Sequence, residues 1–566
     1  MAPQLTSVKS PLTNNPVSSL PGVVAEEVLD YGAINDEEQQ VLDESEDENG
    51  GYLLPMNEMV FVLVPIYCLV FLASLDATVL STLMTDIASD LEAIPYISWI
   101  ATAYLLSTSI VQPLGKLSDI FGRKPSLLLC ITIFTIGCLQ CATASSVWSF
   151  SCGRFLSGFA AGLTALSTII ASDLVPLRAR GVFQGLGNIF FAVGSALGGT
   201  LGGYISENWG WRAVFWCQVP IGICCFFVIL FVFDLPTLPH EIAFKDVSLK
   251  DKLKKVDIWG IVLVACCLLL FITLTAVEMS TSTCFGVVAL LIFGIYLLYK
   301  VECSHEFAII PIELMSNRSV LGSSLANWFG TMYAYVLLYY FPVYLSTVTG
   351  LDSASVGLRL VPNIVFSSLS SIGSGYYMKW SGKYLMFVLI MMASGLFGLM
   401  YQLFRTAPGT TISTFEEFSL NILPISAYAG MLTVTLLSLI AAVPLEYQSS
   451  VTAIQYAFRS MGSTLGTSFS SYLFTSTLSK GLKDNLTAIK PDTVSEKTLS
   501  KIIDAALHDA KYIRSDDAPS WAFDAMVSSY SYSCWTTFIF SLIACAACLA
   551  SLCMVKDNKL HTSVKR

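Results

Sequence analysis

GKLSDIFGRK, from Gly115 to Lys124, is a short charged segment between two long apolar ones, and it is the strongest indication of the fold. Its first and last glycines permit a tight turn. Asp119, Arg123 and Lys124 place charge at helix ends, where it interacts favourably with the peptide dipoles. The stretch is therefore expected to be a cytosolic loop that joins two membrane helices.

The composition of the whole chain supports this interpretation. Hydrophobic residues make up 54% of the sequence and charged residues only 13%, with a mean hydropathy of +0.66. So little charge cannot cover a water-exposed surface, which indicates a polytopic membrane protein. Residues 1–57 contain eleven acidic residues and one basic residue, Lys9, and so account for the whole formal charge of −10. We expect this part to be a disordered acidic cytosolic tail that could bind trafficking or regulatory factors.

Apolar runs long enough to cross a bilayer recur along the rest of the chain. Because a membrane-spanning helix needs about 20 apolar residues, the sequence predicts roughly fourteen transmembrane segments. Their centres lie near residues 71, 106, 135, 161, 194, 223, 267, 292, 332, 366, 394, 432, 464 and 542.

Basic residues predict the orientation of these segments. They follow every second segment and are nearly absent from the short loops between, which places both termini in the cytosol. The basic residues concerned are Lys116, Arg123, Lys124, Arg178, Arg180, Lys245 to Lys255, Lys300, Arg318, Lys379 and Lys383. The long segment 479–527 can be translocated whatever its charge, and we expect it to be a lumenal loop.

An internal repeat divides the chain. The sequence GSALG at Gly194 is echoed by GSTLG at Gly462, and the glycines of the charged loop are echoed by Gly375 and Gly382. Two related halves would suit rocking about a central site, although small-residue patterns also recur by chance in membrane helices. The expected parts are the tail 1–57, an N-terminal six-helix bundle 58–234, a cytosolic linker with two inserted helices 235–318, a C-terminal six-helix bundle 319–555 and a cytosolic tail 556–566.

Several of these motifs resemble the major facilitator superfamily. The loop from Gly115 to Lys124 resembles its cytosolic loop motif, and LDATV from Leu75 resembles the first-helix motif of its fourteen-helix drug:proton antiporters. RFLSG from Arg154 is similar to the fourth-helix motif, with Ser157 in place of the usual Gln. The resemblance implies an all-α fold of two pseudo-repeated six-helix halves with two inserted helices. It also implies a gating role for Gly115, Asp119, Gly122, Arg123, Gly194, Gly198, Gly199, Gly202 and Gly203.

Within that superfamily the chain looks most like the fungal vacuolar basic amino-acid transporters. RARGVFQG from Arg178, and WRAVFWCQVPIG from Trp211, carry this likeness, although multidrug exporters share most of the motifs. Two positions depart from the family pattern. The antiporters have a proline after the glycine at 198, where this chain has Gly199 and Thr200, and the second half has Lys379 at the position of Asp119.

Asp76 and Arg154 are the predicted proton-coupling pair. A carboxylate inside a membrane helix is costly unless it is paired, hydrated or protonated, so it often marks an ion or substrate path. With helix ends at Met59 and Ala171, both residues lie roughly 25 Å above the cytosolic face at about 1.5 Å per residue. We expect them to meet, either as a switch in which a proton or a cationic substrate competes for Asp76, or as a static ion pair.

Other polar residues are weaker candidates for binding substrate. Arg459 could receive a substrate carboxylate or could serve only a structural role. Asn188, Gln455 and Tyr456 lie in the repeated helices and could line a cavity or link helices. The sixteen cysteines fall almost entirely in apolar helices without a second ligand pair, and no phosphate-binding glycine loop is present. We expect no metal, no cofactor and no enzymatic activity.

The sequence thus predicts a proton-coupled antiporter that moves lysine, arginine and histidine from the cytosol into the vacuole. A plasma-membrane exporter of drugs or toxins and a non-transporting nutrient receptor remain alternatives. Asn485 and Asn317 each begin an N-glycosylation pattern. The predicted orientation puts Asn485 in the lumen and Asn317 in the cytosol, so only Asn485 is expected to be modifiable.

Overall fold

The computed structural model describes residues 55–91, 103–104, 107–108, 110–111, 114–232, 252, 256–276, 280–304, 312–351, 353–443, 447–491, 494–508, 510–514 and 518–557. Four predictions lie largely outside these residues. They are the acidic tail 1–57, most of the second apolar segment near 106, most of the linker that begins at 235, and most of the tail 556–566.

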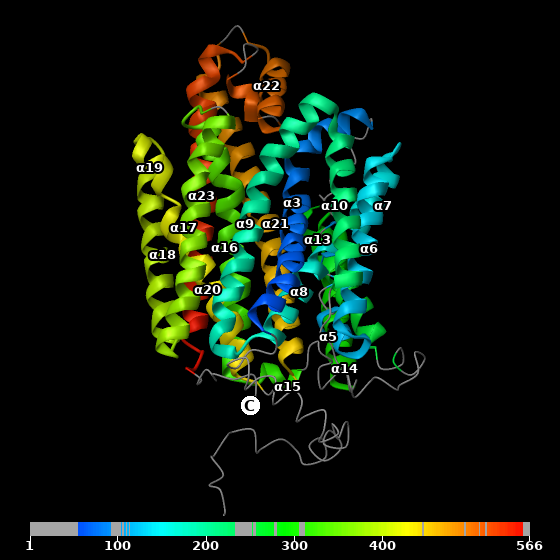
Figure 1. Cartoon of the computed structure of the whole chain (residues 1–566). Coiled ribbons are helices and arrows are strands. Elements are labelled where there is room, and N and C mark those ends of the chain that lie inside the picture. The colour runs from blue at the N-terminus through cyan, green and yellow to red at the C-terminus, as the bar shows by residue number, and fades with distance from the viewer. Residues whose placement is uncertain are drawn as a thin grey trace, which may run out of the picture.

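The N-terminal half consists of helices (Figure 1). They are α3 (Met56–Asp90), α5 (Leu114–Phe121), α6 (Arg123–Ala142), α7 (Val147–Ser157), α8 (Ala160–Leu174), α9 (Leu177–Trp209) and α10 (Trp211–Val232). The expected fourth segment is divided between α7 and α8, because the helix is interrupted at Gly158 and Phe159.

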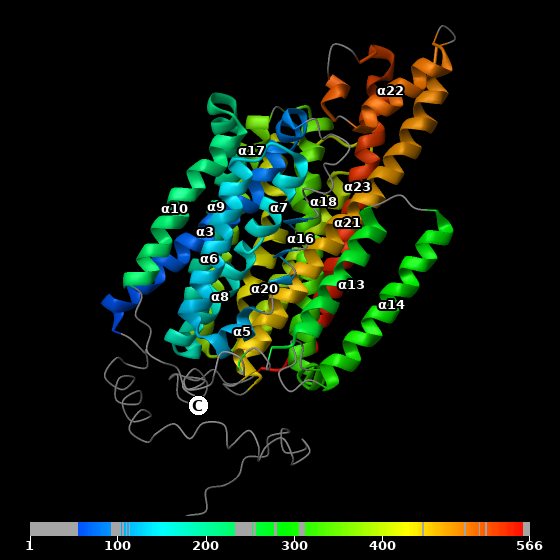
Figure 2. The ribbon, with the colours of Figure 1, turned by 90° about the vertical axis from the view of Figure 1, so that its right-hand side faces the viewer.

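The C-terminal half also consists of long helices, and it has several short ones in addition. They are α15 (Ile312–Met315), α16 (Arg318–Thr347), α17 (Ser353–Ser381), α18 (Leu385–Arg405), α19 (Thr414–Ser419), α20 (Ile422–Ala441), α21 (Gln448–Ile489), α22 (Glu496–His508), η4 (Ala510–Arg514), η5 (Ser520–Ala522) and α23 (Phe523–Leu552). Between the halves in sequence come α13 (Ile258–Ala276) and α14 (Thr281–Ser304), and Figure 2 shows α14 at the side of the bundle.

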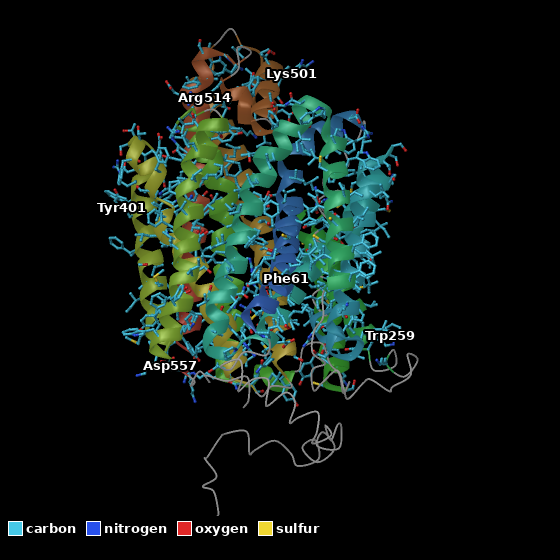
Figure 3. The ribbon with its side chains drawn as sticks, viewed as in Figure 1. Phe61, Trp259, Tyr401, Lys501, Arg514 and Asp557 are labelled. Atoms are coloured by element: carbon cyan, nitrogen blue, oxygen red, sulfur yellow. The ribbon has the colours of Figure 1, made fainter. Side chains whose placement is uncertain are left out.

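We call the end of the bundle that carries α15 the basal end and the end that carries α22 the distal end (Figure 1). Each half packs around apolar cores of its own, for example the one around Phe134 and Leu166 and the one around Phe341 and Met431. The outer surface is apolar as well. Phe61 is 65% exposed, and Figure 3 shows it on the outside of α3.

Ten helices of the described part of the chain are long and apolar enough to cross a membrane. The all-helical, multi-pass fold is thereby confirmed, and fourteen as the exact number of spans stays a prediction. α16 and α21 are long but fall outside this set of ten. Both line the middle of the C-terminal half, where small polar side chains lower the hydropathy of a helix.

The glycine repeat has a matching role in the two halves. A Cβ on Gly194 or Gly198 of α9 would collide with the backbone of α3, at Phe71 and Leu75. A Cβ on Gly462 or Gly466 of α21 would collide with α16 in the same way, at Trp328 and Met332. The repeated sequence therefore forms the same close helix crossing twice.

The described residues of segment 479–527 are mostly helical, so the expectation of a lumenal loop was wrong about their structure. Residues 479–489 continue α21, and α22, η4 and η5 follow. Leu482, Leu486, Ile502 and Tyr530 bury their side chains together in a small core between α21, α22 and α23. The distal end of the C-terminal half is thus a compact helical cap (Figure 1).

Candidate functional site

Asp76 on α3 and Arg154 on α7 form an ion pair inside the N-terminal half. Arg154 Nη1 donates to both carboxylate oxygens of Asp76, at 2.9 and 3.0 Å, and both side chains are 0% exposed. The residues meet because they lie at the same depth on helices that run in opposite directions. The depth argument from the sequence predicted this contact.

The surroundings of the pair are only partly polar. The ring of Tyr104 lies 4.3 Å from the guanidinium carbon of Arg154, and the Ser157 hydroxyl hydrogen-bonds to Asp76. Arg154 Nε and Nη2 have no hydrogen-bond acceptor among the described residues. Removing the charge of Asp76 would leave a buried cation without its counter-ion, which costs several kcal/mol and favours a rearrangement.

The close crossing of α3 and α9 lies directly beside this pair. Gly194 contacts Ser74, and Gly198 contacts Leu75 and Thr78, so the two glycines flank Asp76 along α3. Of the other glycines expected to act in gating, Gly202 is buried and Gly199 is half-buried. An added Cβ on Gly203 would meet nothing within 4 Å.

The C-terminal half has no carboxylate at the position equivalent to Asp76. The two glycine crossings pair Phe71 with Trp328 and Leu75 with Met332, so the next residue, Asp76, corresponds to Tyr333. Tyr333 is fully buried and its hydroxyl donates to the carbonyl of Pro424 at 3.1 Å. At this repeated position only the N-terminal half has an ionisable carboxylate, Asp76.

The charged stretch from Gly115 to Lys124 is not the expected loop: it is helical except at Gly122, where α5 ends and α6 begins. Its polar contacts are centred on Arg123. Arg123 Nη1 lies 2.5 Å from Asp119 and also donates to the Ser118 hydroxyl, while its Nε donates to Asp173 at 3.0 Å. Asp173 belongs to α8. It ties the loop to the fourth segment, and sequence reasoning missed it because the two residues are far apart in the chain.

The loop glycines are required by the backbone. Gly122 has a φ of 95° and Gly382, its counterpart in the C-terminal half, has a φ of 68°. Side chains rarely adopt this conformation, so glycine is favoured at both positions. Gly115 is buried and its carbonyl accepts a hydrogen bond from Arg123.

Polar side chains connect the two halves near the middle of the bundle. Asn188 on α9 donates to Ser371 at 2.9 Å and to Thr433 at 3.3 Å, and Tyr456 on α21 hydrogen-bonds to Thr168 at 2.6 Å. Asn188 and Tyr456 are 268 residues apart, the same offset as between the repeated glycines. The two contacts are therefore pseudo-symmetric copies of each other.

Gln455, unlike Asn188 and Tyr456, does not lie at the contact between the halves. It is buried within the C-terminal half, where its amide nitrogen donates to Asn327 at 3.3 Å and to Thr435 at 3.4 Å. Its contacts link helices α16, α20 and α21 of one half, whereas Asn188 and Tyr456 bridge the two.

A tighter contact between the halves lies toward the basal end. Arg180 Nη1 donates to Gln448 Oε1 at 2.7 Å, and these residues are again 268 apart, so the bond lies near the pseudo-two-fold axis. Cβ atoms on Gly181 or Gly185 of α9 would collide with α17. The described contacts correspond to a conformation closed at the basal end.

Arg459 faces aromatic rings at the same interface. Its guanidinium carbon lies 5.5 Å from the ring centre of Phe191 on α9 and 6.0 Å from that of Tyr456, and its side chain hydrogen-bonds to Tyr428. Among the described residues, no carboxylate forms an ion pair with it.

Both candidate glycosylation sites take part in helix packing. Asn485 lies inside α21, half-buried, and its amide nitrogen, the atom that would carry a glycan, donates to Ser529 at 2.9 Å. Asn317 caps α16, where its side chain accepts a hydrogen bond from the backbone of Ser319. Modification of Asn485 stays a prediction, and a glycan there would have to replace the contact to Ser529.

Comparison with known proteins places this geometry in a family. Residues 66–467 match the family model described as Major Facilitator Superfamily. The chain is 32% identical over 492 residues to the vacuolar membrane amino acid uptake transporter fnx2 of Schizosaccharomyces pombe, covering 82% of this chain and 79% of that protein. It is 31% identical to the multidrug resistance protein fnx1 of the same organism (88% and 92% covered). It is 29% identical to vacuolar basic amino acid transporter 1 of Saccharomyces cerevisiae (87% and 92% covered).

A solved structure agrees with the fold. A double-tryptophan mutant of XylE superposes with a TM-score of 0.54 at 14% sequence identity, covering 88% of this chain and 96% of that one. The two-half helical bundle, its repeated glycine crossings and the charged loop are all present in a chain whose sequence matches the family model over most of its length. This chain is a membrane transporter that belongs to the Major Facilitator Superfamily.

Proposed function

We propose that the transporter exchanges protons for basic amino acids, carrying lysine, arginine and histidine from the cytosol into the vacuole. The observation that carries the proposal is the fully buried pair of Asp76 and Arg154. A titratable carboxylate in the membrane interior typically marks an ion or substrate path. The names of two relatives, an amino acid uptake transporter and a basic amino acid transporter of vacuolar membranes, support the substrate and the location.

In this mechanism the Asp76 carboxylate either binds a proton or attracts the cationic group of the substrate. Protonation of Asp76 frees Arg154, and a cationic substrate competes for the deprotonated carboxylate. Because Gly194 and Gly198 join α3 to α9 beside Asp76, a shift of α3 would be passed directly to α9. α9 in turn packs against α17 of the other half through Gly181 and Gly185.

The direction of transport follows from the predicted orientation. With the basal end in the cytosol, the closed contact between Arg180 and Gln448 would be the cytosolic gate. Exchange of one proton for one monovalent cation moves no net charge, so the pH gradient alone drives it with about 1.4 kcal/mol per pH unit. Among the described residues, Asp76 is the one carboxylate whose side chain is 0% exposed, which supports it as the proton carrier.

The test is uptake of labelled lysine, arginine and histidine into acidified vesicles, with and without a protonophore. Asp76→Asn should abolish gradient-driven uptake while expression and membrane insertion stay near normal, because the amide has nearly the same shape but cannot hold the exchangeable proton. Asp90→Asn is the matched control. It changes the same residue type on the same helix, at an exposed pair with Arg212, and should leave uptake close to wild type.

Wild-type uptake rates in Asp76→Asn would contradict the assignment of the coupling residue. A multidrug exporter is the second candidate, favoured by the similarity to fnx1 over 88% of this chain. Uptake of cationic drugs but not of basic amino acids would select it. Binding of amino acids without any flux would instead favour a nutrient receptor.

A further inference from the structure

We propose that Arg459 is the subsite for a substrate carboxylate, placed on the pseudo-two-fold axis between the halves. This inference rests on the proposed function and narrows its substrates to solutes that carry a carboxylate beside their cationic group. Amines that lack a carboxylate would be excluded, even if their cationic group is the same.

The position of Arg459 follows from the repeat. Arg459 and Phe191 are 268 residues apart, which is also the offset between the repeated glycines. The two residues contact each other, with the guanidinium carbon of Arg459 5.5 Å from the ring centre of Phe191. Two residues that are related by a two-fold axis and touch each other must lie close to that axis. The contact between Arg180 and Gln448 obeys the same rule nearer the basal end. The side chain of Arg459, on α21 of the C-terminal half, therefore lies near the centre of the molecule at the interface between the halves.

The surroundings of Arg459 favour the binding of an anion. An arginine in the membrane interior is costly without a counter-charge, and within the described part of the chain no carboxylate pairs with Arg459. Its neighbours are the rings of Phe191 and Tyr456 and the hydroxyl of Tyr428. Rings stabilise the face of a guanidinium, so the edge donors other than the one bonded to Tyr428 can bind a planar acceptor such as a carboxylate. Arg459 is also half-buried, so part of it remains accessible.

The distance to Asp76 suits a substrate with charges at both ends. Phe191 lies beside Arg459, whereas Gly198 on the same helix lies beside Leu75 and hence at the level of Asp76. The seven residues from 191 to 198 span about 10 Å along the helix axis. A basic amino acid with an extended side chain has its two charged ends separated on this scale. Its carboxylate would point toward the basal end and its cationic end toward Asp76.

Binding of a carboxylate at Arg459 would also affect contacts made by both halves. Tyr456, one turn before Arg459, hydrogen-bonds to Thr168 of the N-terminal half, and Phe191 belongs to that half as well. A carboxylate bound at the guanidinium would compete with these ring contacts. Substrate binding would thereby loosen or tighten the central contact between the halves.

The experiment compares three ligands that share one cationic chain in vesicles that contain the full-length protein. L-lysine has the carboxylate, lysinamide has a neutral amide in its place, and cadaverine lacks the group. In the wild type, lysine should compete with labelled lysine at least about tenfold better than the other two, the difference expected for a charge-assisted hydrogen bond. Arg459→Gln should raise the KM for lysine by a similar factor and leave the inhibition constants of cadaverine and lysinamide unchanged.

Two controls separate this role from a structural one. Arg459→Lys should retain part of the preference for lysine, because it keeps the charge but loses the bidentate geometry. Arg318→Gln removes an exposed arginine of the same half and should change nothing. An equal effect of Arg459→Gln on all three ligands, or equal wild-type uptake of cadaverine and lysine, would overturn the carboxylate subsite without touching proton coupling.

A wild-type protein that does not transport lysine would refute the proposed function but would still leave the subsite testable. Thermal stabilisation of the purified full-length protein would then be measured with glycine, leucine, acetate and methylamine. Stabilisation by the carboxylates that is lost in Arg459→Gln supports the subsite. No stabilisation by any carboxylate overturns it.

Discussion

At the scale of single residues, the centre of this transporter is asymmetric although its helices are repeated. Asp76 has a buried counter-ion in Arg154, while the equivalent Tyr333 donates a hydrogen bond to a backbone carbonyl and carries no charge. One half thus has the carboxylate that we propose exchanges a proton, and the other half has Arg459, which forms no ion pair with a carboxylate among the described residues. A membrane protein can carry such charges only where each one is paired, or becomes paired with a ligand.

A second charged pair allows a prediction of pH dependence. The Arg212 guanidinium and the Trp211 ring N–H donate to Asp90 and lower the pKa of that carboxyl below its ordinary value. A lowered folded-state pKa means that the pair stabilises the protein above the unfolded pKa of about 3.9, and that this contribution is lost as the pH falls through the lowered value.

The difference in Tm between the wild type and Asp90→Asn should therefore be the same at pH 7 and at about pH 5, and should shrink only in stronger acid. Thermal unfolding of the detergent-solubilised protein across this range measures it. The effect should be small, because both side chains are exposed and screened by solvent. A difference that already disappears between pH 7 and pH 5 would show that the pair titrates in the range of an acidic compartment.

At the scale of elements, the repeated glycine crossings set how closely the helices approach. Gly194 and Gly198 bring α9 against α3, and Gly462 and Gly466 bring α21 against α16. The absence of a side chain at these positions permits backbone contact, which in a bilayer replaces the hydrophobic effect as the force between helices. The missing proline after Gly198 has therefore not removed the close approach of the helices.

Gly194→Ala and Gly198→Ala should each destabilise the protein by about 1–3 kcal/mol, the usual cost of overpacking, and should reduce transport strongly. Gly203→Ala on the same helix is the matched control, because its added methyl would meet nothing within 4 Å. Thermal unfolding and vesicle uptake of the three variants decide the matter. If Gly203→Ala were as harmful as Gly194→Ala, helix bending rather than helix packing would be the role of these glycines.

At the scale of the whole molecule, the halves meet through α9 and α17 toward the basal end and through the central contacts of Asn188 and Tyr456. Transport by alternating access requires these contacts to open while the core of each half stays intact. The separate apolar cores of the two halves suit such a rigid-body movement.

Distances between spin labels should therefore change between the halves and not within one. Labels at Leu186→Cys on α9 and Tyr376→Cys on α17 should gain a longer distance when substrate or pH shifts the conformation. Labels at Phe61→Cys and Leu186→Cys lie in the same half and should keep one distance. All three side chains are exposed, and the exposed native cysteines would first be replaced by serine. A single distance between α9 and α17 under all conditions would argue against rocking of the halves.

The membrane location, the helical class, the repeat and the contact between Asp76 and Arg154 could all be predicted from the sequence. These features depend on quantities that are local along the chain, namely hydropathy, residue spacing and the constant rise of a helix, which converts residue number into depth. The resemblance to the superfamily rested on short motifs that are equally local, and the match to its family model confirmed it.

The sequence did not predict which residues face one another across the bundle. The pairing of Arg123 with Asp173, the bond between Arg180 and Gln448, the placement of Gln455 within one half and the contact of Asn485 with Ser529 join segments that are distant in sequence. The physical reason is that such contacts depend on the rotation of each helix about its own axis and on how the two halves pack. Both are set by the sum of many weak contacts between remote segments, which no single stretch of sequence contains.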